Sequence, residues 1–531
     1  MSITPVPKRP DWYTADRVDI GQILALSRLE GREDEIWAPV PGVQIAGPAR
    51  YRVHRSHLPL MTTAPEAARF LLPQPAADRA ARDRHTQALG FTLRPWQHSA
   101  IEYIQQRHGT LLGDSPRVGK TLSCIMSHDP SLGPFVVICP TMVRPVWINW
   151  LQRVFPGETI GVLRGRTFDH RLLQHKLIVG HYEILPWWQS AMPIGTLVFD
   201  EAHLLTNRRA RRTKAAVFLA SRAQRVICAT GTPIWNMPPY LWSVLGLVAP
   251  GAFGSFYDFA NRYGRPVPTA YGTQYTGISN EAELQQRLTE IMLRRRWEDV
   301  ADNLPSISRN VALVELTESQ RRKLDLMTLE IQHNKTKSST IGQLAKYREK
   351  LSTIKADVVI AQARAMLAAG EPVVIWTWHV ALARQIAEAL TAVGDTAFLL
   401  TGETAERDAL IDAWRATPAG ALVCTMAVAQ VGLDFSHAHL AIFAEIDYTP
   451  AILAQAEMRT YAPTRPMNIT YVIADHLVDQ RVVLALLRKL DAANPVGVGA
   501  AGDAIATIQQ ALLGPVEEPD MDRFLESLLE A

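Results

Sequence analysis

The sequence is poor in cysteine, in long apolar runs and in net charge. Of its 531 residues 4 are cysteine, and no two of them form a C-x-x-C pair. Because each cysteine lies within an apolar segment, we expect buried, reduced thiols rather than disulfides or metal ligands. The scarcity of cysteine excludes a small secreted fold held together by disulfides.

Membrane and export signals are also missing. No apolar run approaches the ~20 residues that cross a bilayer. The N-terminal residues MSITPVPKRPDWY lack the basic and then apolar pattern of a signal peptide. We therefore expect a soluble protein with no membrane partner. We expect it in the cytoplasm of a bacterium or of a virus-infected cell, or in the nucleus if its source is eukaryotic.

The charge balance excludes a mainly disordered chain but little else. Lys and Arg number 55 and Asp and Glu 52, so the net charge is +3. Such a chain has no global positive field that would mark a strongly basic nucleic-acid-binding protein. Its charged fraction of 20% and hydrophobic fraction of 47% are ordinary for a folded protein.

What the sequence does contain is two series of apolar strands that alternate with helices. The predicted strands are TLLGD, PFVVICP, KLIVGHY, TLVFD and RVICATGT in the first series, and PVVIWTW, TAFLLTG, GALVCTM, LAIFAEI and NITYVIA in the second. Short, almost wholly apolar strands suit parallel sheets covered by helices on both faces. We therefore predict an α/β fold with two parallel-sheet lobes, helical insertions and a small N-terminal extension.

The same patterns suggest domain boundaries. The extension contains the strand-like segments VQIAG and YRVHR, and the text after the first strand series is helical and aromatic. We assign the extension to 1–88, lobe 1 to 89–310 with a helical insertion at about 237–304, a helical connector to 311–357, lobe 2 to 358–490, and an acidic helical tail to 491–531.

The strongest local signal for chemistry is TLLGDSPRVGKTLSCIM, a predicted strand, loop and helix. Backbone N–H groups at a helix N-terminus bind phosphate, and the pattern G-x-x-x-x-G-K-T adds a lysine and a hydroxyl for Mg²⁺. Lys120 and Thr121 would fill these roles. The match is imperfect because Asp114 stands where the first glycine belongs, and a lone G-K-T would be indecisive.

A second signal follows in LVFDEAH, an apolar strand that ends in two carboxylates. Asp200 is placed to hold Mg²⁺ through water, and Glu201 to orient and deprotonate the attacking water. Alone, the segment could be an acidic helix cap, but that explanation fits poorly after a G-K-T motif. The next predicted strand ends in the hydroxyl-rich turn Thr230-Gly231-Thr232-Pro233, which can couple the carboxylates to neighbouring parts.

In this order, strand-GKT, DEAH and ATGTPIWN resemble motifs I, II and III of superfamily-two helicases, and most closely those of the Swi/Snf-type ATPases. LRPWQ resembles the adenine-side motif of that family, and IMLRRRWEDVADNLP resembles the end of the first lobe in the compact annealing-helicase branch. LTGETAERDAL, AQVGLDFSHA and QAEMRTY resemble second-lobe motifs. The resemblance covers about residues 91–475 and implies two RecA-like lobes that bind ATP, Mg²⁺ and DNA.

The resemblance also implies roles for individual residues. The catalytic candidates are Lys120, Glu201, Arg459 and Arg465. The ATP-binding candidates are Arg94, Gln97, Asp114, Ser115, Val118, Gly119, Lys120, Thr121 and Gln455, and the Mg²⁺ ligands are Thr121 and Asp200. The DNA-binding candidates are Thr141, Arg144, His181, Arg208, Arg209, Arg212, Thr425 and Gly432. The basic run at 208–214 could equally be a solvated helix face, and a packing or inter-lobe role explains Arg294, Arg295 and Arg296 at least as well as DNA contact.

Two departures from the family pattern bear on activity. Arg117 replaces a glycine of motif I, so its side chain must touch the phosphates or point away from them. In the last motif Ala462 stands where the family has a second arginine, and Arg465 could replace it if the chain bends at Pro463. Otherwise Arg459 acts alone and turnover is slow.

The function predicted from the sequence is an ATP-dependent motor on duplex or branched DNA. We expect it to act as a monomer, with residues 1–88 available to protein partners. Two alternatives remain open. One is a helicase that tracks along single-stranded DNA or RNA, and the other is a weakly hydrolysing, nucleotide-gated DNA-binding scaffold, which Arg117 and Ala462 motivate.

Overall fold

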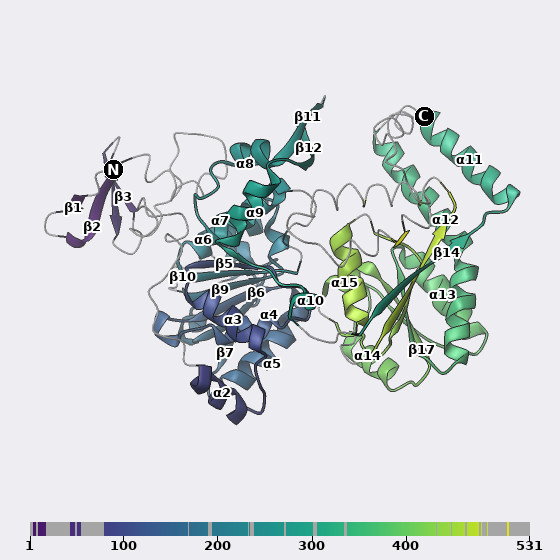
Figure 1. Ribbon diagram of the computed structural model, residues 1–531, viewed down its shortest axis with the longest axis horizontal. Coiled ribbons are helices and arrows are strands. Elements are labelled where there is room, and N and C mark those ends of the chain that lie inside the picture. The colour runs from purple at the N-terminus through teal and green to yellow at the C-terminus, as the bar shows by residue number, and fades with distance from the viewer. Residues whose placement is uncertain are drawn as a thin grey trace. The chain divides into compact units, whose positions relative to one another are not determined.

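A computed structural model describes most of the chain from residue 79 to residue 476, together with short N-terminal strands (Figure 1). The described ranges are 4–6, 9–16, 43–47, 50–54, 79–167, 169–188, 194–231, 233, 238–269, 272–300, 305–333, 337–431, 433–447, 449–461, 465–476, 479, 486 and 507–508. Met1–Ala301 and Ala492–Gly497 form one compact unit, and Asp302–Asp491 and Val498–Ala531 form the other. Apart from residues 507–508, the predicted acidic tail lies outside the described residues.

The N-terminal extension contains a small antiparallel sheet. Its strands follow the order β1-β2-β4-β3. They are β1 (Thr4–Val6), β2 (Arg9–Asp16), β3 (Val43–Gly47) and β4 (Arg50–His54). The strands expected at VQIAG and YRVHR are confirmed as β3 and β4, whereas β1 and β2 were not predicted.

The first lobe contains a seven-stranded parallel sheet in the order β13-β5-β10-β9-β6-β8-β7. Its strands are β5 (Gly109–Leu112), β6 (Phe135–Cys139), β7 (Ile160–Val162), β8 (Leu177–His181), β9 (Ile194–Asp200), β10 (Ala223–Ala229) and β13 (Met292–Leu293). All five strands predicted for this lobe are confirmed. The two strands that were missed, β7 and β13, are the short edges of the sheet.

Helices surround this sheet because its strands are apolar on both faces. Val137 and Val198 belong to one buried cluster with residues of α3, α4 and α5, while the alternate residues Val136 and Ile138 are buried as well. Burial of successive residues is the signature of a sheet covered on both sides. The helices of the unit are α2 (Arg79–Ala88), α3 (Pro95–Gln105), α4 (Lys120–Met126), α5 (Arg144–Val154), α6 (Arg211–Ala220), α7 (Trp242–Val248), α8 (Phe256–Tyr263), α9 (Glu281–Thr289) and α10 (Trp297–Val300).

The insertion at 237–304 is only partly helical. Helices α7, α8 and α9 are present, but β11 (Gly264–Thr269) and β12 (Gly272–Ile278) form an antiparallel hairpin between α8 and α9. Helix α9 ends at Thr289, and Met292 and Leu293 then pair with Leu111 and Leu112 of β5 as strand β13. A free sheet edge with unpaired backbone groups explains why this segment becomes a strand.

The second lobe contains a six-stranded parallel sheet in the order β14-β19-β18-β15-β17-β16. Its strands are β14 (Ile307–Val314), β15 (Val373–Thr377), β16 (Thr396–Leu400), β17 (Gly420–Thr425), β18 (Leu440–Phe443) and β19 (Met467–Ala474). Its helices are α11 (Glu318–His333), α12 (Lys337–Ala368), α13 (Val380–Ala392), α14 (Arg407–Arg415) and α15 (Pro450–Thr460). The five strands predicted for this lobe are confirmed.

Strand β14 changes the boundaries expected from the sequence. It pairs with β19 along its 8 residues, so 307–310 belong to the second sheet and not to lobe 1. The segment 311–314, assigned to a helical connector, is the rest of this strand. The rest of the assigned connector contains α11 and the first part of α12, which continues to Ala368.

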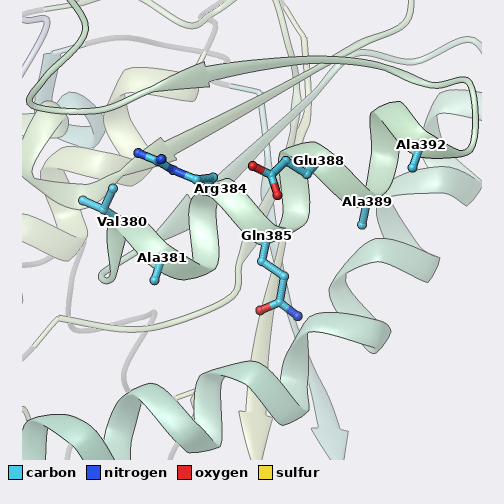
Figure 2. A pocket seen from close by; sticks show the side chains of 7 residues that line it. All are labelled: Val380, Ala381, Arg384, Gln385, Glu388, Ala389 and Ala392. Carbon is cyan, nitrogen blue, oxygen red and sulfur yellow. The ribbon is translucent and has the colours of Figure 1, made fainter.

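The described residues also show the state of the cysteines and a surface groove. The four cysteines are unpaired and buried, as predicted. Among the described residues no helix is long and apolar enough to span a membrane. An open groove of about 730 Å³ follows the exposed side of α13 (Figure 2), lined by Val380, Ala381, Arg384, Gln385, Glu388, Ala389 and Ala392.

Candidate active site

Three adjacent strands of the first sheet end in one row. The register pairs Ala229 of β10 with Leu112 of β5 on one side and with Asp200 of β9 on the other. From this row the chain continues into the predicted phosphate loop, the hydroxyl-rich turn and the DEAH segment. Three motifs far apart in the sequence therefore meet at the carboxyl edge of a parallel sheet, where such folds bind ligands.

The phosphate loop requires glycine at its end. Gly119 caps α4 with a φ of 98°, in the left-handed region that glycine adopts without strain. A Cβ at this position would lie 2.4 Å from Nε2 of Gln97. Gln97 Nε2 donates to the Gly119 carbonyl at 3.4 Å, so the start of α3 packs directly on the loop.

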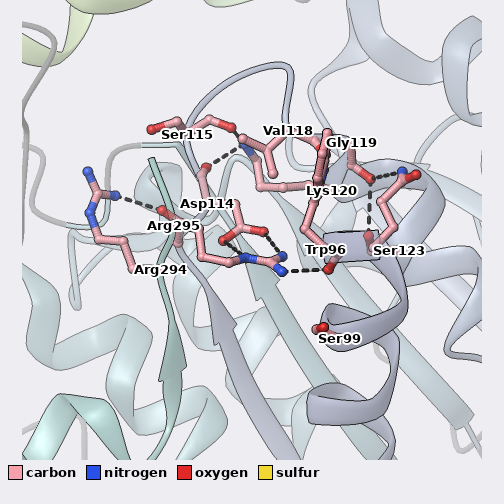
Figure 3. Close-up of polar contacts among 12 residues, drawn as sticks. Trp96, Ser99, Asp114, Ser115, Val118, Gly119, Lys120, Ser123, Arg294 and Arg295 are labelled. Atoms are coloured by element: carbon pink, nitrogen blue, oxygen red, sulfur yellow. Dashed lines mark hydrogen bonds and ion pairs between the residues drawn. The ribbon is translucent and has the colours of Figure 1, made fainter. Parts of the chain in front are cut away.

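The loop folds around the ammonium group of Lys120. Lys120 Nζ donates to the carbonyl oxygens of Asp114 and Ser115 at 2.7 and 3.0 Å (Figure 3). Burial lowers the pKa of Lys120, and the negative charges of Glu201, Asp114 and Asp200 oppose that shift. The ammonium group of Lys120 thus lies near carboxylates and bonds to backbone oxygens, while Lys120 itself begins α4, whose N-terminal N–H groups can bind phosphate.

Arg117 occupies a backbone conformation that favours glycine. Its φ is 68°, in the left-handed region. A non-glycine residue there costs roughly 1–2 kcal/mol. The family pattern, which has glycine at this position, and the backbone of this chain therefore agree, and the arginine is a strained substitution.

The side chains on the adenine-side motif hold the loop from the other direction. Arg94 N donates to Gln97 Oε1 at 2.9 Å in a capping box at the start of α3. Trp96 Nε1 donates to the Val118 carbonyl at 3.0 Å. The predicted ATP-binding residues Arg94, Gln97, Val118 and Gly119 are thus brought together. Trp96 was not predicted as a site residue, although it lies within the LRPWQ motif.

Asp200 is a buried carboxylate at the tip of β9, with 9% of the residue exposed. It accepts hydrogen bonds from Trp147 Nε1 at 2.7 Å and from Glu201 N at 3.1 Å. Burial and the charge of Glu201 raise the pKa of Asp200 to about 6, against the opposing effects of Trp147 and Lys120. A divalent cation would stabilise the charged form of a carboxylate whose pKa is raised by burial and a neighbouring negative charge, so the site fits Mg²⁺. Trp147 was not anticipated, because it lies on another element.

The DEAH segment contacts the hydroxyl-rich turn through a histidine. His203 Nδ1 lies 3.3 Å from Glu201 Oε2 and 3.1 Å from Thr230 Oγ1. Glu201 itself has a φ of 52°, which turns the chain sharply after the strand. The turn is therefore linked to Glu201 through His203, while Thr232 lies outside the described residues.

The consecutive residues Arg294, Arg295 and Arg296 follow β13, and the first two contact the phosphate loop. Arg294 Nη1 donates to the Gly113 carbonyl at 2.6 Å, and Arg295 forms an ion pair with Asp114. Arg296 instead pairs with Asp299 at 3.4 Å. Packing thus accounts for Arg294 and Arg295. The buried ion pair also explains why an aspartate occupies position 114.

Three DNA-binding candidates gather at the ends of β6 and β8. Parallel pairing sets Cys139 opposite His181, which brings the following residues together. His181 Nδ1 and Thr141 Oγ1 lie 2.7 and 3.3 Å from Glu183 Oε2, and Arg144 Nε donates to the Thr141 carbonyl at 3.2 Å. Tyr182, between them in sequence, is buried and donates to the Asp200 carbonyl.

The other DNA-binding candidates are dispersed. The guanidinium of Arg208 lies 4.4 Å from the ring centroid of Phe256, whereas Arg209 is exposed and Arg212 is half-buried. The predicted basic run therefore does not present one uniform face. Thr425 is buried at the end of β17, and Gly432 lies outside the described residues.

In the second lobe, α15 carries two of the predicted site residues. Gln455 is buried and Arg459 is half-buried in its last turn. The Arg459 carbonyl accepts from Phe435 N at 2.9 Å. Arg465 lies beyond the helix and donates to the carbonyls of Ser436 and His437, so the structure places its guanidinium on contacts within its own lobe.

A buried ion pair that sequence analysis missed holds α15 against the sheet. Glu457 is fully buried and accepts from Arg309 Nε and Nη2 at 3.1 and 3.0 Å. Tyr471 of β19 also donates to Glu457. The sequence signal was Glu457 within QAEMRTY, but its partners lie on β14 and β19.

Known proteins resemble this chain over the same region. Residues 85–359 match the SNF2-related domain and residues 355–462 the helicase conserved C-terminal domain. The chain is 28% identical over 433 residues to the SWI/SNF-related matrix-associated actin-dependent regulator of chromatin subfamily A-like protein 1 of Xenopus tropicalis, covering 78% of this chain and 46% of that protein. It is 24% identical over 426 residues to the DNA annealing helicase and endonuclease ZRANB3 of Mus musculus, covering 75% and 40%.

The chain therefore spans less than half the length of these two relatives. Among solved structures, the Sulfolobus solfataricus SWI2/SNF2 ATPase core in complex with dsDNA is 21% identical, with a TM-score of 0.37 over 80% of this chain and 97% of that one. The SNF2-related match covers just over half of the 531 residues. The chain belongs to the SNF2-related family, as its motifs predicted.

Proposed function

We propose that this chain is an ATP-driven motor that moves along duplex DNA. The observation that carries the proposal is the common edge at which the phosphate loop, the DEAH carboxylates and the Thr230 turn meet. Family membership supports an ATPase, and the name of the ZRANB3 relative, a DNA annealing helicase, supports DNA as the track. The chain would act as a monomer, with residues 1–88 available to protein partners.

In this proposal Lys120 and the N–H groups of the first turn of α4 bind the phosphates of ATP. Thr121 and Asp200 hold Mg²⁺, which neutralises phosphate charge when bound. Gln97, beside Arg94, recognises adenine. Gln455, on α15 of the second lobe, is a further ATP-binding residue in this proposal. The loop contacts of Gln97 and Trp96 support this assignment because they join the adenine-side motif to the phosphate loop.

Glu201 serves as the general base that orients water and accepts its proton. His203 lies beside Glu201 and Thr230, so it can orient the Glu201 carboxylate and couple movement of that carboxylate to the Thr230 turn. Arg459 supplies positive charge for the γ-phosphate during hydrolysis. Arg465 supports Arg459 indirectly by tying the chain after α15 to the carbonyls of Ser436 and His437.

DNA contacts in this proposal are to phosphates rather than to bases. Thr141, Arg144 and His181 form the best-supported group, because the pairing of β6 and β8 places them together. Hydroxyl and guanidinium donors of this kind hold the backbone without reading sequence. Arg209, Arg212, Arg208, Thr425 and Gly432 remain weaker predictions.

The primary test is ATP turnover by the full chain with duplex DNA, with single-stranded DNA and without nucleic acid. We expect the largest stimulation by duplex, and loss of turnover in Lys120→Ala and Glu201→Gln. Equal turnover with and without nucleic acid would exclude a DNA motor. Stimulation by single strands alone would favour a single-strand-tracking helicase.

Movement requires its own measurement. A third DNA strand annealed to a duplex reports translocation, since a motor on the duplex displaces it. We expect displacement that needs ATP and is lost in Glu201→Gln. Duplex-stimulated hydrolysis without displacement would separate an ATPase from a translocase.

One observation favours a second candidate, a nucleotide-gated DNA-binding scaffold that hydrolyses slowly. Position 462 is alanine, and Arg465 bonds to carbonyls within its own lobe. Tight, nucleotide-dependent DNA binding with little turnover would support the scaffold. Robust turnover that falls in Arg459→Ala would exclude it.

A further inference from the structure

Arg295 makes three kinds of contact at the phosphate loop (Figure 3). Its Nε donates to Asp114 Oδ1 at 3.1 Å and its Nη2 to Asp114 Oδ2. Its Nη1 donates to the carbonyl of Trp96 at the start of α3. Its own carbonyl accepts from Ser115 N at 2.9 Å. One residue thus bonds to both the loop and the helix that carries the adenine-side motif.

The ion pair is shielded from water. The side chain of Asp114 is 2% exposed and that of Arg295 is 14% exposed. A bidentate guanidinium–carboxylate pair is strong and fixes the orientation of both groups. If either partner is removed, the other charge is left buried, so the loop must rearrange to solvate it.

The pair is also connected directly to Lys120. The carbonyl of Asp114, whose carboxylate Arg295 holds, accepts from Lys120 Nζ at 2.7 Å. Trp96, whose carbonyl Arg295 holds, donates to the Val118 carbonyl on the far side of the loop. Movement of Arg295 would therefore shift the loop at both ends.

We propose that Arg295 is a positioning residue for nucleotide binding: through Asp114 and Trp96 it holds the phosphate loop in the conformation that receives the phosphates of ATP. This inference rests on the proposed function. Arg295 does not itself touch the nucleotide, and its effect passes through the loop. The loss of Arg295 should therefore weaken nucleotide binding more than it slows the chemical step.

The test is direct titration of the full chain with a fluorescent ADP analogue, together with steady-state ATP turnover. We expect Arg295→Ala to raise Kd and KM about tenfold with a smaller fall in kcat. Arg295→Lys should keep part of the affinity because it keeps the charge but loses the bidentate geometry. The matched control is Arg296→Ala, an exposed neighbour paired with Asp299, which should bind like the wild type.

A double-mutant cycle with Asp114→Ala separates coupling from general destabilisation. We expect the double variant to bind about as weakly as Arg295→Ala, since both changes break one pair. Additive losses would overturn the proposal, as would an unchanged Kd and KM accompanied by a lower Tm. If Arg295→Ala does not fold, Arg295→Lys with Asp114→Asn carries the same cycle. If the wild-type chain binds no nucleotide, the proposed function fails, and this inference with it.

Discussion

Each lobe has a buried carboxylate at the carboxyl edge of its sheet, but the surroundings shift the pKa values of the two in opposite directions. Asp200 is the last residue of β9 and accepts two hydrogen bonds among the described residues. Glu445, which follows β18, accepts four, from Ser352 Oγ, the backbone N–H groups of Trp378 and His379, and His379 Nδ1. Both carboxylates are buried, but Glu445 accepts twice as many hydrogen bonds as Asp200 to offset the cost of burying its charge.

The pKa values follow this difference. Burial and Glu201 raise the pKa of Asp200 to about 6. Burial would also raise the pKa of Glu445, but His379, Lys355 and Ser352 outweigh it and lower the pKa to about 2. The charge of Glu445 is fully hydrogen-bonded by its neighbours, as is typical of a buried polar group with a structural role. Asp200 has fewer compensating partners, and a raised carboxylate pKa of this kind is typical of binding and catalytic sites.

The largest effect expected at the edge of the first lobe is on catalysis. Glu201→Gln should lower kcat about 100-fold or more, because the amide cannot accept the proton of the attacking water. ATP binding should persist, since the phosphate loop is unchanged. Single-turnover hydrolysis with duplex DNA measures the loss. Glu388→Gln, on the exposed side of α13, is a control that should retain full activity.

The next effect belongs to the second lobe. Glu445→Ala should destabilise the region of β15 and β18 by about 3 kcal/mol, because His379 and the backbone donors lose their shared acceptor. Hydrogen exchange of the peptides that contain these strands, in the full chain, reports the change locally. An unchanged exchange rate would show that the four hydrogen bonds are not what stabilises this edge.

The opposite sign is expected for the corresponding change in the first lobe. Without nucleotide and with Mg²⁺ chelated, Asp200→Asn should stabilise the region of β9 by about 1 kcal/mol at pH 7.5, although ATP turnover is lost. The physical reason is that the amide removes a charge that burial penalises. The gain is smaller than removal of the charge alone would give, because one amide oxygen cannot accept from both Trp147 Nε1 and Glu201 N. Slower hydrogen exchange of the β9 peptide would confirm it. Destabilisation would contradict the contrast between the two lobes.

The two variants should also respond to pH in opposite directions. The native pKa of Asp200 lies above its ordinary value of 3.8, so its penalty appears as pH rises from about 4 through 6. The benefit of Asp200→Asn should therefore vanish near pH 4. The native pKa of Glu445 lies below its ordinary 4.5, so its contribution is full above that pH and is lost as pH falls toward 2. Exchange or Tm measured for each variant against the wild type at several pH values tests both.

The smallest effect concerns the strained arginine of the loop. Arg117→Gly relieves a left-handed backbone but adds freedom to the unfolded chain, so stability should change by about 1 kcal/mol or less. We expect a stable variant with nucleotide affinity within about threefold of the wild type. Ten-fold weaker binding of the fluorescent ADP analogue would show that the arginine side chain contacts the phosphates.

Strand patterns in the sequence predicted ten strands of the two parallel sheets, and all of them except β16 are central, because buried parallel strands are apolar throughout. The missed strands of the two parallel sheets, β7, β13 and β14, all lie at sheet edges. The first two are 3 and 2 residues long, and β14 alternates partly buried with exposed residues, so periodicity and length gave weak signals. Tertiary pairing, rather than local pattern, made them strands.

The site shows the same division. The motifs predicted Lys120, Asp200 and Glu201 as site residues because each type of chemistry needs particular side chains in a particular order. They did not identify Trp147 or the role of Arg295, since a supporting residue has no required type or spacing. The replacement of glycine by Asp114 was visible as a departure, but its partner could not be found without the fold.

By itself the sequence determined the family, the two α/β lobes and the motifs that meet at the carboxyl edge of the first sheet. The tertiary structure alone decided the charge environment of those residues. Asp200 and Trp147 are 53 positions apart, Glu445 and His379 are 66 apart, and Asp114 and Arg295 are 181 apart. A pKa depends on burial and on neighbouring charges, and in a folded chain both come from segments that are distant in sequence.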